Sequence, residues 1–196
     1  MKHIFYHLTA VMVVVVWGMT FISTKVLIVH GLSAQEIFLF RFLLAYAAVC
    51  PISFHRFFAR NLKDELYLVG GGVLGGSLFF FLQNIALGLT QASNVSFIIC
   101  MAPLLTAVLT VLSVRTEKVS RGFIYGSIIA LLGVGLLIFN GSFILRISPL
   151  GDLLTLLASL SWAFYSLVIR SLTRKYSPAF ITRKIFFYGI ITILPT

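Results

Sequence analysis

Three polar side chains lie inside apolar stretches of the sequence, where they could bind a charged or hydrogen-bonding molecule. Arg41 stands between Phe40 and Phe42, and its guanidinium is suited to bidentate binding of a carboxylate or a phosphate. Gln83 and Asn84 are neighbours in a second apolar stretch. Two amides among apolar side chains must find partners, either on a neighbouring helix or in a wet cavity. The chemistry indicated is non-covalent binding of a small polar molecule.

A polar and aromatic face occurs twice. The first lies in the stretch 13–26, VVVVWGMTFISTKV, where four valines give way to polar residues. At 100° per residue, an arc of about 120° contains its four polar or aromatic residues: Trp17, Thr20, Ser23 and Thr24. The second lies in the stretch 159–170, SLSWAFYSLVIR, and a similar face is made there by Ser159, Trp162, Tyr165 and Ser166. We expect both faces to turn toward the interior of a helix bundle.

Each of these residues also has a purely structural interpretation. Gly, Ser and Thr are the usual residues where membrane helices touch, and this interpretation is favoured for Gly18 and Ser23. For Trp17 and Thr20, helix packing and cavity lining are equal alternatives. Trp and Tyr also gather at the membrane surface, but Trp17 and Trp162 each lie near the middle of an apolar run. Their depth favours a cavity.

Arg41 is the most costly residue to place in a membrane, at about 2.5–3.5 kcal/mol for a charge at the centre of a helix. Its structural alternatives are snorkelling to the outer surface and an ordinary ion pair with the nearby Glu36. Lys25 is expected to be an interfacial anchor, although it could bind the same anion as Arg41.

The composition is that of a membrane protein. Of the 196 residues, 60% are hydrophobic and 10% charged, and the mean hydropathy is +1.07, whereas soluble domains average roughly 45–50% apolar and ~25% charged residues. The net charge of +10 does not indicate a nucleic-acid partner, because the basic residues occur in short clusters between apolar runs. The partner implied is the lipid bilayer.

Six apolar runs are long enough for the roughly 20 residues with which a helix crosses a bilayer. They fall at 8–29, 36–55, 66–88, 93–114, 122–140 and 150–169, and a seventh begins near 180. The fold class predicted is an all-α polytopic membrane protein. Pro103 is expected to kink the fourth run, because it leaves Ile99 without its helical partner. In the third run, GGGVLGG contains two pairs at GxxxG spacing, which predicts close helix packing: Gly71 with Gly75, and Gly72 with Gly76.

Lys and Arg are retained in short cytoplasmic loops, so their distribution predicts the orientation. Twelve lie at the N-terminus or in the joins after the second, fourth and sixth runs: Lys2; Arg56, Arg60 and Lys63; Arg115, Lys118 and Arg121; and Arg170, Arg174, Lys175, Arg183 and Lys184. The opposite side has only Lys25 and Arg146, and Arg41 lies inside the second run. The asymmetry predicts a multi-pass protein of the inner or plasma membrane with a cytoplasmic N-terminus.

The sequence contains a weak internal repeat. Trp17 matches Trp162 at an offset of 145, and Pro51 matches Pro195 at an offset of 144. The second copy begins five runs after the first, and five is odd, so the second copy crosses the membrane in the opposite direction. Such inverted repeats are typical of secondary transporters. We expect a first five-helix repeat at 1–145 and the start of a second, inverted repeat at 146–196. A complete pair would need about 290 residues, so six full spans and a truncated seventh are expected, as in a fragment or truncated product of a ten-helix protein.

The order of these stretches resembles that of the EamA-type permeases of the drug/metabolite transporter superfamily. The similarity covers the whole chain and is carried by WGMTFISTK, FRFLLA, ALGLTQASNVSFIICMAPLLTAVL, EKVSRGFIYGSIIALLGVGLLI and GDLLTLLASLSWAFYSLVIR. It implies ten helices in a basket around a central substrate cavity. The chain departs from this pattern at its C-terminus, where most of the seventh helix and the last three are expected to be missing.

The sequence offers no site for enzyme chemistry. The four histidines lie near the ends of runs and do not converge with a nucleophile: His3, His7, His30 and His55. Asp64 and Glu65 are assigned to a cytoplasmic loop, and no carboxylate is expected deep within a run, so no proton-carrying carboxylate is predicted. We therefore predict no catalytic residue, no cofactor and no metal.

The function predicted is transport of a small polar or amphipathic metabolite, amino-acid-like or drug-like, by alternating access. Eight residues are expected to bind this metabolite: Trp17, Thr20, Thr24, Arg41, Gln83, Asn84, Trp162 and Tyr165. The alternative is a non-transporting membrane scaffold or partner subunit, such as a truncated product.

Overall fold

The computed structural model describes residues 2–53, 57–113, 120–139 and 148–194, and this part of the chain forms helices and no strand. In chain order the elements are α1 (Lys2–Val29), α2 (Ala34–Val49), the 3-10 helix η1 (Cys50–Ser53), α3 (Leu62–Gly71), the π-helix η2 (Gly72–Leu78), α4 (Phe79–Leu89), α5 (Ala92–Ile99), α6 (Ala102–Ser113), α7 (Arg121–Phe139), α8 (Pro149–Arg170) and α9 (Pro178–Ile193). Some residues used for the predicted orientation and repeat lie outside the described ranges: Arg56, Arg115, Lys118, Arg146 and Pro195.

Within the described ranges, five helical segments are long and apolar enough to cross a membrane: Ile4–Val29, Ala34–Ser53, Leu62–Leu89, Ala92–Ser113 and Pro149–Arg170. They coincide with five of the six predicted runs. The remaining predicted run, 122–140, coincides with helix α7 (Arg121–Phe139), which is not among these five. The predicted seventh run forms α9, a helix of 16 residues. The all-α membrane architecture expected from the sequence is therefore confirmed.

The third span begins earlier than predicted. Asn61 is the N-cap of α3, and its Oδ1 accepts a hydrogen bond from the Asp64 backbone N–H at 2.8 Å. Asp64 and Glu65 therefore lie in the first turn of a membrane helix, and their assignment to a loop is wrong. Carboxylates are favoured at this position, because the first turn of a helix carries unpaired N–H groups and the positive end of its dipole.

The middle of the third span is the π-helix η2, a rare form that frequently occurs at functional sites. Two neighbouring helices make polar contacts with it. The Ser161 hydroxyl of α8 donates to the Leu74 carbonyl at 2.7 Å, and the Thr192 hydroxyl of α9 donates to the Ser77 hydroxyl at 2.8 Å. Hydrogen bonds from α8 and from α9 thus stabilise the π-helix η2.

The fourth span is broken at the predicted place. Helix α5 ends at Ile99 and α6 begins at Ala102, next to Pro103, which has no N–H to donate to the preceding turn. The predicted kink is confirmed.

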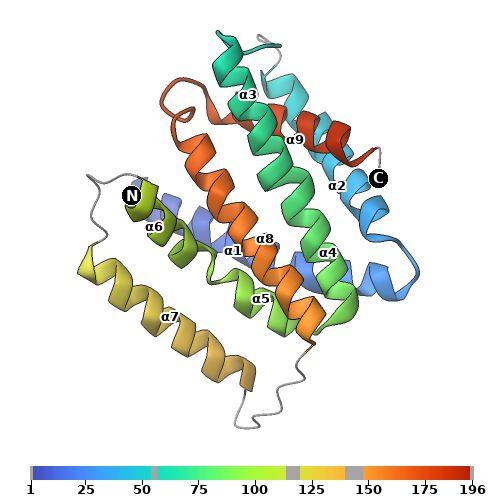
Figure 1. The fold of residues 1–196 in the computed structure, drawn as a ribbon, viewed down its shortest axis with the longest axis vertical. Coiled ribbons are helices and arrows are strands. Elements are labelled where there is room, and N and C mark those ends of the chain that lie inside the picture. Colours follow the sequence, from blue (N-terminus) through green and yellow to red (C-terminus); the bar gives the residue numbers. More distant parts are fainter. Residues whose placement is uncertain (1, 54–56, 114–119, 140–147, 195–196) are drawn as a thin grey trace.

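Helices α3, η2 and α4 form one continuous segment that lies beside α8, and α9 packs on η2 (Figure 1). Glycine makes the contact with α9 possible. A Cβ atom on Gly72 would collide with Tyr188 Cβ and lie 3.2 Å from the Gly189 nitrogen, and a Cβ on Gly76 would lie 3.2 Å from the Gly189 Cα. The close packing expected from the GxxxG spacing is confirmed.

Two basic residues that the sequence analysis assigned to a loop lie in a described helix and are buried there. Arg183 and Lys184 belong to α9 and are only 3% and 4% exposed. Arg183 donates to the Ser53 carbonyl, and Lys184 forms an ion pair with Glu65. The loop assignment is wrong because these partners, distant in sequence, allow the two cations to enter the bundle.

Candidate functional site

Arg41 on α2 faces the interior of the bundle. Its Nη1 donates a hydrogen bond to the Thr24 hydroxyl of α1 at 3.3 Å, and Thr24 is buried. The guanidinium carbon lies 5.5 Å from the centre of the Phe80 ring of α4, within the range of a cation–π contact. These contacts bring two of the predicted site residues, Thr24 and Arg41, together, and they direct Arg41 toward α1 and α4 instead of the outer surface.

The other charged groups near Arg41 have structural roles. The Glu36 carboxylate accepts from the Ser33 N–H and from the Ser33 hydroxyl, both at 2.8 Å, in a capping box at the start of α2. Lys25 Nζ donates to the Leu87 carbonyl and, at 2.9 Å, to the Thr90 carbonyl. Lys25 therefore binds the last carbonyls of α4, as basic residues often do at a helix C-terminus, and anchors α1 to that end.

The two predicted amides differ in their surroundings. Gln83 and Asn84 are 0% and 1% exposed. Asn84 Nδ2 donates to the Ala34 carbonyl of α2 at 3.1 Å. Neither polar atom of the Gln83 side chain, nor Asn84 Oδ1, has a hydrogen-bond partner in the described part of the chain. Asn84 thus binds a neighbouring helix, whereas the buried Gln83 amide has no partner in this part of the chain.

The predicted aromatic residues come together from three helices. The Trp162 ring of α8 is 6.0 Å from Trp17 of α1, 4.8 Å from Phe79 of α4 and 5.0 Å from Tyr165, centre to centre. The Tyr165 ring lies against Gly75 of η2, where any Cβ would collide with it. We call Trp17, Phe79, Trp162 and Tyr165 the aromatic cluster. Phe79 was missed by the sequence analysis, although its position four residues before Gln83 puts it on the same face of α4.

The small hydroxyl residues of the two predicted faces bond mainly to their own helices. The Thr20 hydroxyl donates to the Trp17 carbonyl at 2.6 Å, and the Ser23 hydroxyl to the Met19 carbonyl at 3.0 Å. In α8 the Ser166 hydroxyl donates to the Trp162 carbonyl at 2.9 Å. Such bonds to the preceding turn are common in membrane helices. The structure therefore does not bring Thr20 to Arg41, in contrast to Thr24.

No group of three or more His, Cys, Asp or Glu side chains that could hold a metal occurs among the described residues. An apolar groove runs between α6 and α7, where Val108 and Phe123 are among the residues that line it. It contains none of the eight predicted residues, so it is distinct from the candidate site.

Known proteins resemble this chain over most of its length. The model of the EamA-like transporter family matches residues 4–139. An uncharacterized transporter of Archaeoglobus fulgidus is 28% identical over 181 residues, which cover 91% of this chain and 62% of the archaeal protein. The chain thus spans less than two thirds of that relative. No solved structure matches it. Because the family model covers more than half of the residues, and the chain forms the apolar helices of a multi-pass membrane protein, it belongs to the EamA-like transporter family.

Proposed function

We propose that the chain forms part of a permease that carries a small polar or amphipathic metabolite, amino-acid-like or drug-like, through the cell membrane by alternating access. The two moving parts are inverted five-helix halves, of which residues 1–145 form the first and residues 146–196 begin the second. In this proposal the eight predicted residues surround the path of the metabolite, and the N-terminus is cytoplasmic.

The observation that carries the proposal is the Gln83 side chain. Its amide is completely buried and has no partner among the described residues. An unsatisfied polar group in a membrane bundle is costly and needs a partner. A metabolite that donates to Oε1 and accepts from Nε2 would supply one.

The surroundings of Gln83 suit a molecule with a polar and an apolar part. Phe80, one turn before Gln83 on α4, contacts the Arg41 guanidinium, which can bind an anionic group. Phe79, on the Gln83 face, belongs to the aromatic cluster, which can pack against an apolar group. The cationic group and the aromatic cluster thus contact consecutive residues of α4, Phe80 and Phe79.

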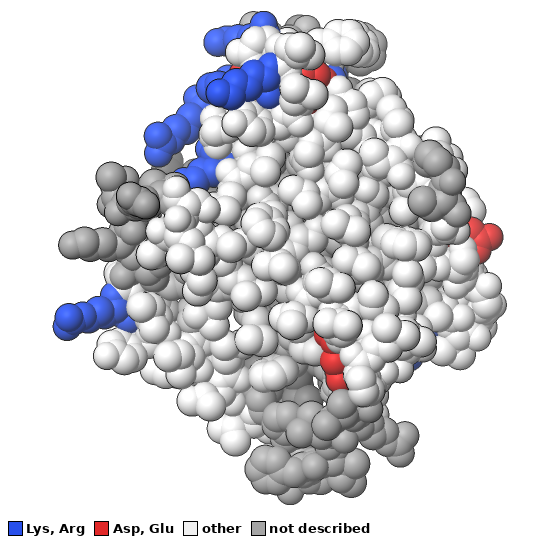
Figure 2. Space-filling model, in the orientation of Figure 1, with Lys and Arg blue, Asp and Glu red and all other residues white. Residues whose placement is uncertain are grey.

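The charge distribution supports the proposed orientation. Lys and Arg side chains gather toward the upper left of the molecule in Figure 2, and Figure 1 shows that α3 begins and α8 ends in this upper part. Basic residues are retained on the cytoplasmic side.

The proposed orientation can be tested by labelling. A membrane-impermeant reagent applied to intact cells should fail to label a cysteine placed at Lys63, whereas the same reagent applied from the cytoplasmic side should label it.

The test of the proposed function is flux in liposomes. The full-length product of the gene, reconstituted and supplied with a panel of labelled metabolites, should accelerate the flux of at least one of them. A scaffold or partner subunit would fold in the membrane and carry none, and the buried, unsatisfied amide would then have no role. The absence of flux across a broad panel would therefore remove the main support for transport.

Arg41→Gln is expected to reduce this flux by about tenfold or more without loss of folded yield, because a charge-assisted, bidentate contact with the metabolite disappears. Arg41→Lys keeps the charge and loses the forked geometry, so its flux should lie between that of Arg41→Gln and that of the unmodified protein. Arg121→Gln, at the exposed start of α7, is the matched control and should leave flux unchanged. Equal flux in Arg41→Gln and in the control would exclude Arg41 from binding.

A further inference from the structure

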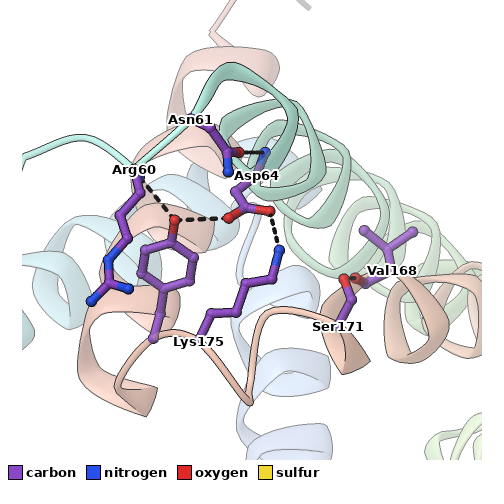
Figure 3. Close-up of polar contacts among 7 residues, drawn as sticks. Arg60, Asn61, Asp64, Val168, Ser171 and Lys175 are labelled. Carbon is purple, nitrogen blue, oxygen red and sulfur yellow. Dashed lines mark hydrogen bonds and ion pairs between the residues drawn. The ribbon is translucent and has the colours of Figure 1, made fainter.

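Asp64, in the first turn of α3, is held by two residues of the connection between α8 and α9. Its Oδ1 accepts from Lys175 Nζ at 2.8 Å, and its Oδ2 accepts from the Tyr176 hydroxyl at 2.9 Å (Figure 3). The Tyr176 oxygen in turn accepts from the Arg60 N–H at 2.8 Å. The Asp64 side chain is 3% exposed and that of Lys175 is 50% exposed. The hydrogen bond that Lys175 donates to Asp64 raises the pKa of Lys175 above its usual value, so Lys175 carries its positive charge at neutral pH.

Glu65 is held in the same manner by α9. Its Oε1 accepts from Lys184 Nζ and from the Tyr188 hydroxyl, and its Oε2 accepts from the Ala59 N–H at 2.6 Å. Lys184 Nζ also lies 4.7 Å from the centre of the Phe58 ring. Each carboxylate is thus bound by one lysine and one tyrosine. We call these residues the charged cluster: Asp64, Glu65, Lys175, Tyr176, Lys184 and Tyr188.

Stability alone does not explain the charged cluster. Beside it, the contact between α3, α8 and α9 is made by apolar residues, including Leu68, Ile169 and Ile185, and farther along by the glycines of η2 and α9. Replacing a buried ion pair by apolar residues is often neutral or stabilising, whereas removing one partner is strongly destabilising. A buried charge pair therefore favours one arrangement of helices and penalises others.

The position of the charged cluster indicates which arrangement it favours. It lies at the end of the bundle where α3 begins, α8 ends and α9 begins (Figure 1). Gln83 is 19 residues beyond Asp64 in the same span, which is roughly 28 Å at the rise of an α-helix. The Asp64 carboxylate is thus remote from Gln83, and the charged cluster ties α3 to helices that the proposed repeat assigns to the other half.

We infer that the charged cluster is a latch that keeps this end of the bundle closed and separates when α9 moves away from α3. This inference rests on the proposed permease function. Opening would admit water, in which an ion pair contributes little, so the separated charges are well solvated. The latch therefore opposes opening at first and opposes it no longer once the pairs have parted.

The test is the labelling rate of a cysteine at Leu68, which is fully buried between α3, α8 and α9. Purified protein in lipid nanodiscs, with Cys50 and Cys100 replaced by alanine, is treated with a water-soluble maleimide. Glu65→Gln should raise the labelling rate of Leu68→Cys by about tenfold or more, because the closed state then holds an unpaired buried lysine.

Two further measurements separate a latch from general loosening. Ala86→Cys, buried on α4 away from the charged cluster, should label equally slowly with and without Glu65→Gln, and an equal rise at both cysteines would overturn the latch. Lys175→Gln removes the half-exposed lysine of the charged cluster. It should raise the labelling rate of Leu68→Cys less than Glu65→Gln does. If Glu65→Gln does not fold, Lys175→Gln is the deciding variant. An unchanged labelling rate of Leu68→Cys in that variant contradicts the inference.

Flux of the same proteins distinguishes failure of the latch from failure of the permease. An unmodified protein that carries no metabolite overturns the proposed function and therefore the latch, whatever the labelling shows. Measurable flux together with unchanged labelling of Leu68→Cys in both variants overturns only the latch.

Discussion

Gln83→Leu is expected to make the protein more stable and to stop transport. Leucine removes an amide whose Nε2 and Oε1 have no partner among the described residues, and relief of such a buried group is worth about 1–3 kcal/mol. The same change removes the hydrogen bonds that the amide is proposed to make with the metabolite. The midpoint of thermal unfolding should therefore rise while flux in liposomes falls by about tenfold or more, measured on one preparation.

Gln91→Leu is the matched control, because Gln91 is exposed before the first turn of α5. It makes the same chemical change away from the proposed path, and neither the flux nor the unfolding midpoint should rise or fall appreciably. A Gln83→Leu variant that unfolds at a lower temperature would show instead that the amide has a structural partner. Unchanged flux would remove Gln83 from the binding site.

Gly72→Ala is expected to weaken the packing of α9 on the third span. The added methyl group would collide with Tyr188 Cβ and press on the Gly189 backbone, and backbone atoms cannot move aside as the end of a side chain can. Overpacking of this kind typically costs about 1–3 kcal/mol. The measurement is the unfolding midpoint and the yield of monodisperse protein in detergent, and both should fall.

Gly70→Ala provides the control two residues earlier in the same sequence. Apart from its chain neighbours and its own helix backbone, no atom of the described residues lies within 4 Å of a Cβ at this position, and alanine favours a helix over glycine by roughly 0.5–1 kcal/mol. This variant should be as stable as the unmodified protein or slightly more stable. Equal losses in both variants would show that the glycines matter for backbone flexibility and not for close approach to α9.

The spans could be predicted because they depend on properties that the sequence displays directly. A bilayer demands a minimum length of apolar helix, and the runs at 8–29 and 150–169 satisfy it in the sequence as they do in the structure. The break beside Pro103 was equally accessible, because proline removes a donor wherever it occurs. The close approach at Gly72 and Gly76 followed from their spacing alone.

The charged end of the third span could not be predicted in this way. Hydropathy falls at Asp64 and Glu65, so the apolar run starts after them, although the helix already begins at Leu62. Their partners, Lys175 and Lys184, are 111 and 119 residues away. Only the fold shows that these four charges form two ion pairs.

The candidate site was predictable in its residue types and not in its pairings. The sequence indicated Trp17 and Trp162 by their depth and Thr24 and Arg41 by their polarity. The contact between Thr24 and Arg41 is known only from the structure. The difference between Gln83 and Asn84 depends on which of them meets the Ala34 carbonyl at the start of α2. That contact joins residues 50 positions apart, and helical periodicity carries no information about it.

The π-helix η2 also sets the rotational phase of the helix that follows it. A π turn contains more residues than an α turn, and each added residue rotates the following helix by about 100° relative to an uninterrupted α-helix. The directions in which Phe79 and Gln83 point are therefore fixed by the winding of Gly72–Leu78, as well as by their own positions in α4. A single deletion between residues 72 and 78 would leave the span apolar and long enough to cross the membrane, yet it would turn the Gln83 amide away from its present position.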